Sequence, residues 1–581
     1  MPTANSSSGA AELLTEAQAS NYRRTGSYAE VVTLCEAFAA RWPEKVRKLE
    51  FGRTPERRPL LALLVSGCGT LDAHEIRRRN IPVLMVQAGI HPGESDGKDA
   101  GFIVLRELLT DSTRSAVAAA LQKIVLLFVP VLSPDGHERV GPWNRANQNG
   151  PEATGWRANA QNLNLNRDYA KLDAPELQAL LRLMEQFDPL LCVDLHVANG
   201  ADFEHDVSIQ VEPLHLGAAQ LHPLGVAIRD FVIAALSASG SQPLPFYPVL
   251  AQQDDPAGGF VDYVFTPRYS TGYWPLRNRF TMLVETHAWK DYGHRVAVTA
   301  NVIRSLVELA ASQGSQWRRA VDAADVAGAT LGGSQVTINY SLTDHVETVS
   351  FRGYAYTRSP SDISGALMTE YHRGEPQLWL VPLRGDIQPS LSARAPRGGY
   401  YIAAGYALDV APRLTLHGIS FQVMHTPLTA VPLESFRAAR VDFDSEPNEG
   451  RWRAAVSGEW CSETLHIAAG ALFVPIAQPR AQLAMALLEP QAPDSFAAWG
   501  FFNAAFERKE YLEAYVAEQQ ARRMLADNPA LGVEFARRLV SDAHFAADPA
   551  ARLDFFYQRH PAWDQRLGLI PVFRSETVPA L

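Results

Sequence analysis

The feature that most limits the fold of this chain is an alternation of short apolar runs with amphipathic stretches over residues 27–315. Val83–Gln87 and residues 124–131 and 190–195 are almost wholly apolar, as strands buried on both faces of a sheet are. Between them, stretches such as residues 97–110 carry apolar side chains at helical spacing. The alternation predicts an α/β sheet that is covered by helices on both faces.

Changes of pattern divide the 581 residues into four parts. Residues 1–26 begin with a small, polar stretch and predict a flexible leader. Residues 27–320 are expected to form a catalytic domain, and strand-like segments between turn-forming residues predict a β-rich accessory domain over 330–475. Residues 476–581 predict a mainly helical region. We expect the accessory domain to stabilise the catalytic domain or to border its cleft; a carbohydrate- or peptide-binding module is the alternative.

Composition excludes few classes of protein. With 47% hydrophobic and 20% charged residues, the chain is expected to fold around sizeable cores. A net charge of −10 argues against nucleic acid or an anionic membrane as the main partner. We expect no membrane span. The N-terminus lacks the pattern of a secretory signal, which predicts a cytoplasmic protein, or a periplasmic or secreted one whose signal has been removed. The oligomeric state is not predicted.

Residues with metal-binding chemistry follow two of the predicted strands. His91 and Glu94 lie in the loop after Val83–Gln87, and His196 follows the run 190–195. Open α/β sheets bind ligands at the carboxyl ends of their strands. Two imidazoles and a carboxylate are the protein ligands of a catalytic zinc that keeps a fourth position for water. A histidine satisfied at the rim of the core is the alternative for His196.

The spacing of His91 and Glu94 is weak support by itself, because His372 and Glu375 repeat it in the β-rich region. We interpret this second copy as a surface loop. The strand end at His196, which supplies a third ligand, distinguishes the first copy from the second.

A loop rich in Asn and Arg lies between the predicted ligands. Arg167 offers a guanidinium fork suited to a carboxylate, and Asn166 adds a neutral donor. Arg157 is placed to stabilise an oxyanion. Such a loop is also typical of a solvated turn, so these roles depend on a nearby metal.

A glutamate ends the apolar run 280–285. Burying an unpaired carboxylate is costly, so Glu285 is either paired or used. Beside a metal-bound water it would act as general base. Pairing with Arg277 or Arg279 is the alternative.

These motifs resemble those of the M14 zinc carboxypeptidases, the carboxypeptidase A-like metallopeptidases. In that family an H-x-x-E motif, an arginine, an Asn-Arg pair, a histidine after a strand and a glutamate on a late strand occur in this order, as they do here. The turn at residues 133–136 resembles the family's N-P-D-G. The resemblance covers about half the chain and is closest to a large bacterial multidomain branch.

The resemblance implies a carboxypeptidase-like α/β/α sandwich with a mixed eight-stranded sheet. It implies one zinc ion (Zn2+) per chain on His91, Glu94 and His196, with Glu285 as general base and acid. It further implies that Arg157 polarises the scissile carbonyl and that Asn166 and Arg167 hold the substrate's terminal carboxylate. A tyrosine also serves the substrate pocket in the family, and here we expect Tyr269, with Tyr263 and Tyr273 as competitors.

The expected function is that of a zinc metallocarboxypeptidase, which hydrolyses the C-terminal peptide bond of a peptide through a metal-activated water. A related zinc amidohydrolase that acts on cell-wall peptides or N-acyl amino acids is the alternative. A binding or scaffold protein with an inactive centre is the third hypothesis, and it is weakened because every chemical role has a residue to fill it.

Overall fold

A mixed sheet of eight strands forms the centre of the N-terminal half of this computed structural model, which describes residues 13–110 and 119–579. The strand order is β1 (Val46–Arg53), β2 (Pro59–Ser66), β4 (Val125–Val129), β3 (Val83–Gln87), β5 (Leu191–Ala198), β10 (Phe280–His287), β6 (Val207–Glu212) and β7 (Pro243–Leu244). Strands β4, β3, β5 and β10 are parallel, and antiparallel pairs flank them on both sides. The predicted mixed eight-stranded sheet is confirmed.

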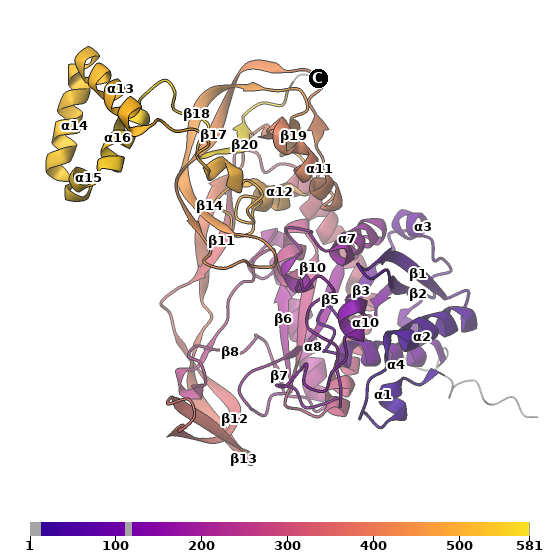
Figure 1. Cartoon of the computed structure of the whole chain (residues 1–581). Coiled ribbons are helices and arrows are strands. Elements are labelled where there is room, and N and C mark those ends of the chain that lie inside the picture. Colours follow the sequence, from indigo (N-terminus) through magenta and orange to yellow (C-terminus); the bar gives the residue numbers. More distant parts are fainter. Residues whose placement is uncertain (1–12, 111–118, 580–581) are drawn as a thin grey trace, which may run out of the picture.

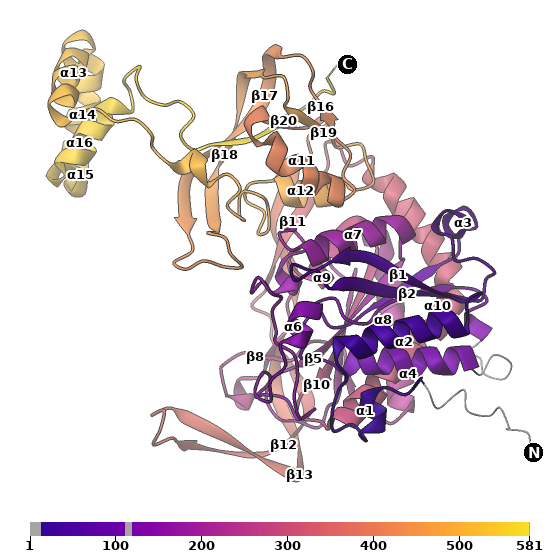
Figure 2. The same ribbon diagram turned by 45° about the vertical axis from the view of Figure 1, so that its right-hand side comes forward.

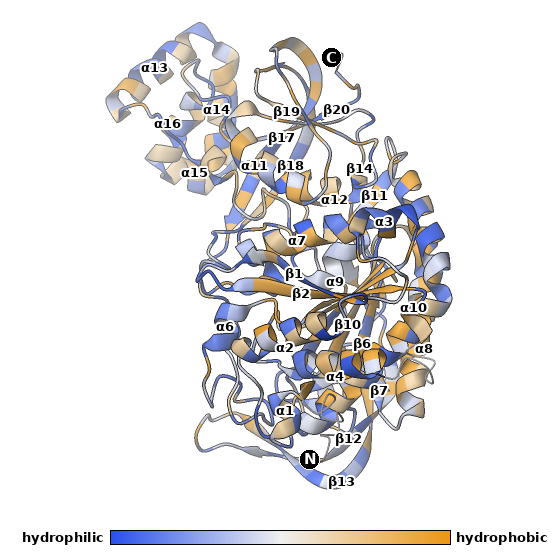
Figure 3. Ribbon diagram, turned by 90° about the vertical axis from the view of Figure 1, so that its right-hand side faces the viewer, coloured by the Kyte–Doolittle hydropathy of each residue, from blue (hydrophilic) through white to orange (hydrophobic). Residues whose placement is uncertain are grey.

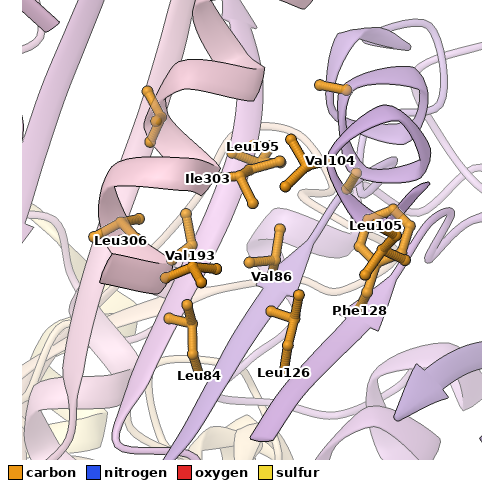
Figure 4. Packing of buried hydrophobic residues seen from close by; sticks show 14 of the residues in the cluster. Leu84, Val86, Val104, Leu105, Leu126, Phe128, Val193, Leu195, Ile303 and Leu306 are labelled. Carbon is orange, nitrogen blue, oxygen red and sulfur yellow. The ribbon is translucent and has the colours of Figure 1, made fainter. Parts of the chain in front are cut away.

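Helices cover both faces of this sheet (Figure 3). One face carries α2 (Tyr28–Arg41), α4 (Asp96–Thr110), α8 (His222–Ala238) and α10 (Tyr292–Gly328), and the other carries α3 (Ala73–Arg78) and α7 (Pro175–Phe187). Val104 of α4 and Ile303 of α10 pack against Val86 and Val193 of the sheet (Figure 4). Each helix buries one apolar stripe, and the result is the α/β/α sandwich that the sequence predicts.

The parallel strands place their carboxyl ends at one edge of the sheet. Leu84 of β3 pairs with Leu191 of β5. On the other side of β5, the register with β10 puts His196 directly beside Glu285. The loop that begins after β3 carries His91 to the same edge. The fold therefore brings together side chains that lie almost two hundred residues apart in sequence.

The remaining strands form three smaller sheets above and below the sandwich (Figure 1). A six-stranded sheet contains β16 (Gln422–Val423), β19 (Leu472–Pro475), β15 (Gly399–Ile402), β20 (Leu569–Ser575), β17 (Leu428–Phe443) and β18 (Ala454–Ile467). Strands β11 (Gln335–Leu342) and β14 (Ile387–Arg394) form a pair. The long hairpin of β12 (Glu347–Pro360) and β13 (Leu367–Arg384) joins β9 (Phe260–Val261) and β8 (Val249–Leu250), which precede β10 in the chain.

The region after residue 475 is helical only in part. Helix α12 (Ala481–Leu488) is followed by α13 (Ala514–Asp527), α14 (Pro529–Ser541), α15 (Ala543–Ala547) and α16 (Pro549–Tyr557), and the last four stand apart from the sheets in two views (Figures 1 and 2). The chain then returns as β20, which pairs with β15 and β17. The mainly helical prediction missed this strand because it is short and contains Pro571.

The predicted leader of residues 1–26 is too long. From Leu13 onward the chain packs on the core: Leu13 and Ala17 are buried, and α1 (Glu16–Ala19) begins with a capping box at Thr15. Two apolar side chains in a polar stretch were too weak a signal to predict this. Residues 1–12 lie outside the described part of the chain.

One helical segment in the described ranges, Ala219–Ala238, meets the length and composition of a membrane span, which by itself is weak evidence for one. It contains α8, whose residues Ile228, Val232 and Leu236 are fully buried in the core below the sheet. This face accounts for part of the segment's apolar composition, whereas Val226 and Phe231 are exposed.

Asp173 joins the sandwich to the accessory region. Its carboxylate accepts hydrogen bonds from Arg451 at 2.6 and 2.7 Å and from Arg413 at 2.9 Å, and Lys171 lies 3.3 Å away. Arg413 belongs to α11 (Ala407–Leu416), and Arg451 to the loop between β17 and β18. Burial would raise the pKa of Asp173, but these cations lower it to about 2. The ionised carboxylate of Asp173 therefore links the sandwich to the accessory region through specific hydrogen bonds.

We expect Asp173→Asn to lower the melting temperature at pH 7, with a loss of about 2 kcal/mol, because the pKa falls from 3.8 to about 2 on folding. A carboxyl group whose pKa is lower in the folded state stabilises the fold when the pH is above its unfolded-state pKa. This contribution is lost as the pH falls through its folded-state pKa. The difference in stability between variant and wild type should thus be largest above pH 5 and should shrink toward pH 3. Thermal unfolding across this range measures it, with Asp442→Asn, at an exposed pair with Arg440, as control. A gap that does not depend on pH would contradict the assignment.

Candidate active site

Three side chains converge at the carboxyl edge of the central strands. Glu94 Oε1 lies 3.2 Å from His91 Nδ1, Glu94 Oε2 lies 3.0 Å from His196 Nδ1, and the two Nδ1 atoms lie 3.2 Å apart. All three residues are buried, and their potential ligand atoms lie within 4.8 Å of one another. Two imidazole nitrogens that face each other beside a carboxylate suit a shared cation. The residues thus fit the zinc ion that the sequence predicts.

The outer ring nitrogens of both histidines face fixed oxygen atoms. His91 Nε2 lies 3.0 Å from Asn164 Oδ1, and His196 Nε2 lies 2.9 Å from Asp194 Oδ2. Ser270 Oγ donates to Asp194 at 2.6 Å. Such partners favour a proton on Nε2 and leave the Nδ1 lone pair for a metal. Asp194 therefore lies where it can orient the imidazole of His196.

Burial affects the two histidines differently. It lowers the pKa of His91 to about 4, so that this imidazole is neutral and able to bind a metal. Burial also disfavours the charged form of His196, but Asp194 and Glu94 outweigh it and hold the pKa well above its usual value. A dication held by His91, Glu94 and His196 would replace the proton on His196 Nδ1, the ring nitrogen that faces Glu94.

Glu285 stands beside this group without belonging to it. It pairs with His196 across the β5–β10 ladder and keeps part of its side chain exposed. Burial raises the pKa of Glu285 to about 8; Glu94 adds to this effect, while His196 and Arg157 oppose it. A cation on the three residues would favour the ionised form that a general base needs.

The alternative partners of Glu285 are engaged elsewhere. Arg277 forms an ion pair with Glu185, and Arg279 pairs with Asp188 and Asp325. These contacts remove the arginines that would make Glu285 a simple rim carboxylate.

Two arginines approach Glu94. Arg157 Nη1 lies 3.3 Å from Glu94 Oε1, and 41% of its side chain is exposed, so it has room to turn toward a substrate. Arg145 Nη1 lies 3.0 Å from the same oxygen, but its side chain is only 6% exposed and donates to the carbonyl of Val197. The sequence analysis missed Arg145, because its loop shows neither strand nor motif; the structure makes it a fixed countercharge to Glu94.

Asn166 and Arg167 lie in a short 3-10 helix, Leu165–Arg167, at the same edge. Asn166 Oδ1 accepts the backbone N–H of Ser270 at 2.9 Å, which fixes the amide group. Arg167 donates to the carbonyl of Asn166 at 2.7 Å, and its guanidinium carbon lies 4.2 Å from the ring centre of Tyr269. Burial lowers the pKa of Arg167, as expected for a partly desolvated cation that could bind an anion.

The three candidate tyrosines have different environments. Tyr273 is fully buried, and its hydroxyl lies 2.9 Å from His417 Nδ1, so it is a core residue. Tyr263 is 40% exposed, and Tyr269 lies against Arg167, which makes Tyr269 the better placed of the three. Tyr247, which the sequence did not suggest, also lies near the centre: burial and then the charges of Glu285 and Glu94 raise the pKa of its phenol. Its only sequence signal was an aromatic residue in a Pro-rich loop.

The second H-x-x-E copy lies on the β12–β13 hairpin. His372 pairs with Ala355 at an irregular point of the ladder, and Glu375 is exposed. The predicted surface loop is wrong in its secondary structure, because both residues lie within strand β13; Glu375 is exposed as expected.

Comparison with known families supports the site's chemistry. Residues 31–200 match the model of the peptidase M14 family, described as zinc carboxypeptidase. This stretch contains His91, Glu94, Arg157 and His196, and it ends before Glu285. Over residues 31–200 the chain is similar to the zinc carboxypeptidases of this family. The predicted resemblance is confirmed for this stretch, and zinc is the metal that the family uses.

Individual relatives of the zinc carboxypeptidase stretch are distant. Mouse (Mus musculus) carboxypeptidase A4 is 28% identical over 111 residues, which cover 19% of this chain and 24% of that protein. The chain thus spans about a quarter of the length of this curated relative. Among solved structures, the metallo-carboxypeptidase of Burkholderia cenocepacia is similar over 47% of this chain and 68% of its own, with 16% identity and a TM-score of 0.34. For carboxypeptidase A of Helicoverpa armigera these values are 50%, 74%, 18% and 0.36.

Proposed function

We propose that this protein is a zinc-dependent metallocarboxypeptidase that removes the C-terminal residue of a peptide. The observation that carries the proposal is the convergence of His91, Glu94 and His196, with Glu285 beside them in register and an Asn-Arg pair at the same edge of the sheet. Each group has a partner or position that suits its proposed role. The roles of the individual residues form part of this proposal.

Glu285 and Arg157 are assigned the chemical step. When bound, a zinc ion would lower the pKa of a water molecule and polarise the scissile carbonyl. Glu285 accepts a proton from the attacking water and delivers it to the nitrogen of the leaving amine. Arg157, which is partly exposed, donates hydrogen bonds to the carbonyl oxygen as negative charge develops on it.

Asn166, Arg167 and Tyr269 are assigned the recognition of the substrate's end. The Arg167 guanidinium binds the terminal carboxylate, and the amide of Asn166, held by Ser270, adds a neutral donor. The ring of Tyr269 supports the guanidinium from one side. A site with one fixed cation for a carboxylate suits an exopeptidase, because an internal peptide bond offers no such group.

We expect about one zinc ion per chain by elemental analysis, and loss of single residues from the C-termini of a peptide library followed by mass spectrometry. The same peptides with an amidated C-terminus serve as control, and their cleavage should fall strongly because Arg167 loses its charged partner. Zinc without shortening of any peptide would favour the zinc amidohydrolase. Failure to bind zinc, even after reconstitution, would contradict the proposal.

A further inference from the structure

A turn from the accessory region reaches the candidate active site. The β17–β18 hairpin closes at Asn448–Arg451, whose two backbones are paired in both directions. Glu449 and Gly450 at its tip have φ angles of +50° and +75°. This is the left-handed region that glycine and asparagine favour and that disfavours a glutamate. Glu449 thus occupies a position at which backbone conformation alone would select another residue.

The side chain of Glu449 makes a specific contact across the interface. Its Oε2 accepts the backbone N–H of Asn164 at 2.7 Å. Asn164 in turn uses its side-chain oxygen at two points of the site, at 3.0 Å from His91 Nε2 and at 3.0 Å from the backbone N of Asn166. One hydrogen bond from the accessory region therefore holds the residue that links a predicted metal ligand to the predicted carboxylate-binding turn.

The charge of Glu449 acts on the same turn. Burial lowers the pKa of Arg167, and the Glu449 carboxylate is among the groups that oppose this effect. Arg451, two residues further on, fixes the turn to Asp173 of the sandwich with bonds of 2.6 and 2.7 Å. The position of Glu449 is therefore defined from both sides.

A residue of the C-terminal region holds the segment that carries Tyr269. Asp494, which is buried, accepts the backbone N–H of Arg268 at 2.8 Å and lies 2.8 Å from its Nε. Arg268 directly precedes Tyr269, whose ring contacts Arg167. Residues after position 330 thus contact both segments that carry the proposed substrate-binding side chains.

We propose that Glu449 is a positioning residue of the active site: from the accessory region it holds the Asn164–Arg167 turn in the conformation that binds the substrate's terminal carboxylate. This inference rests on the proposed function and extends it, because it makes the C-terminal region part of the substrate-binding site. A hydrogen bond donated to a charged acceptor is among the stronger ones in proteins, so its removal is expected to be measurable.

Glu449→Gly tests the inference at a small cost in folding. Glycine suits the left-handed turn and so offsets part of the stability lost with the hydrogen bond; the protein should stay folded, and zinc content should remain at one per chain. We expect KM for a peptide with a free C-terminus to rise at least about tenfold, with kcat changed less than about threefold. Glu449→Asn, which also suits the turn but is one methylene shorter, should give the same result if the glycine variant proves unstable.

Glu449→Gln and Glu446→Ala are the matched controls. Glutamine keeps an acceptor of the same length and should restore most of the affinity, and Glu446 is exposed on the same loop, so its removal should change nothing. An unchanged KM in both the glycine and asparagine variants would overturn the inference, as would a glutamine variant as defective as glycine. A wild-type protein that cleaves no peptide would instead refute the proposed function, and this inference with it.

Discussion

We expect Glu285→Gln to lower kcat for peptide hydrolysis by about a thousandfold or more while the protein keeps one zinc ion per chain. Glutamine has nearly the same shape as glutamate, but it cannot accept a proton from water, and general base catalysis of this kind contributes about 10²–10⁴-fold to rates. Glu285 lies beside His196 but outside the group of potential ligand atoms, so its loss removes no donor to the metal.

The electrostatics of the site predict how Glu285→Gln affects zinc binding, separately from its effect on kcat. The Glu94 carboxylate contributes to the raised pKa of Glu285, about 8, after the larger effect of burial. A cation at the site would favour ionised Glu285, so by linkage Glu285→Gln should weaken zinc binding to some extent, while His91, Glu94 and His196 still hold one ion per chain. Steady-state hydrolysis and elemental analysis on the same preparation measure both quantities.

Glu375→Gln is the natural control, because it makes the same chemical change in the second H-x-x-E copy, on an exposed part of the β12–β13 hairpin. Its activity and zinc content should equal those of wild type. A Glu285→Gln enzyme that retains more than about a tenth of the wild-type kcat would refute Glu285 as the base. Loss of zinc together with activity would show instead that Glu285 helps to bind the metal.

Local pattern was sufficient to predict the centre of the fold. Strand β3 was predicted with its observed bounds, and β4 and β5 within a few residues, because parallel strands buried on both faces are continuous apolar runs. Because parallel strands end on the same side of a sheet, the predicted strand ends placed His91, His196 and Glu285 at one edge. Fold class and candidate ligands therefore follow from short-range information.

Pairing between remote segments could not be predicted in the same way. Strand β20 joins a sheet whose neighbouring strands lie more than a hundred residues earlier. Strand β9 pairs with β13, and β8 pairs with β9. Two-residue strands carry no periodicity, and a proline weakens the signal of β20. Register and partner choice depend on packing that no local window contains.

The same limit applies to the site. Arg145 and Glu449 sit in loops without motif or periodicity, and each matters only through what the fold places beside it: Glu94 for the first and Asn164 for the second. Residues that perform chemistry were recognisable by type and order, whereas those that position them were not. This division is expected, because supporting contacts can be made by many residue types from many directions.

We expect His196→Ala to abolish both stoichiometric zinc binding and hydrolysis. The change leaves only two of the three predicted ligands, His91 and Glu94, whereas catalytic zinc sites use three protein ligands. Wild-type protein should retain about one zinc per chain through dialysis against a weak chelator, while the variant should retain less than about a tenth of that amount.

Thermal unfolding provides a readout that does not require turnover. A ligand that binds only the folded state stabilises it by an amount that grows with its concentration over Kd, so chelation should lower the melting temperature of wild type and zinc should restore it. His196→Ala should lose this response. Its metal-free form should also be less stable than metal-free wild type, because Asp194 and Glu94 remain buried without the imidazole that lies 2.9 and 3.0 Å from them.

His372→Ala separates a ligand from a histidine that merely shares the spacing. His372 stands three residues before Glu375, as His91 stands before Glu94. Among the residues that the structure describes, no third potential ligand joins these two. Loss of His372 should therefore alter neither the zinc content nor the zinc-dependent melting temperature. If His196→Ala still bound one zinc ion and His372→Ala did not, the metal would lie on the hairpin and the assignment of the centre would be wrong. If both variants kept the ion, the three residues at the sheet edge would be a buried polar cluster without a metal. Loss in His196→Ala alone requires the ion to lie between the two Nδ1 atoms and Glu94, which is where the proposed reaction needs it.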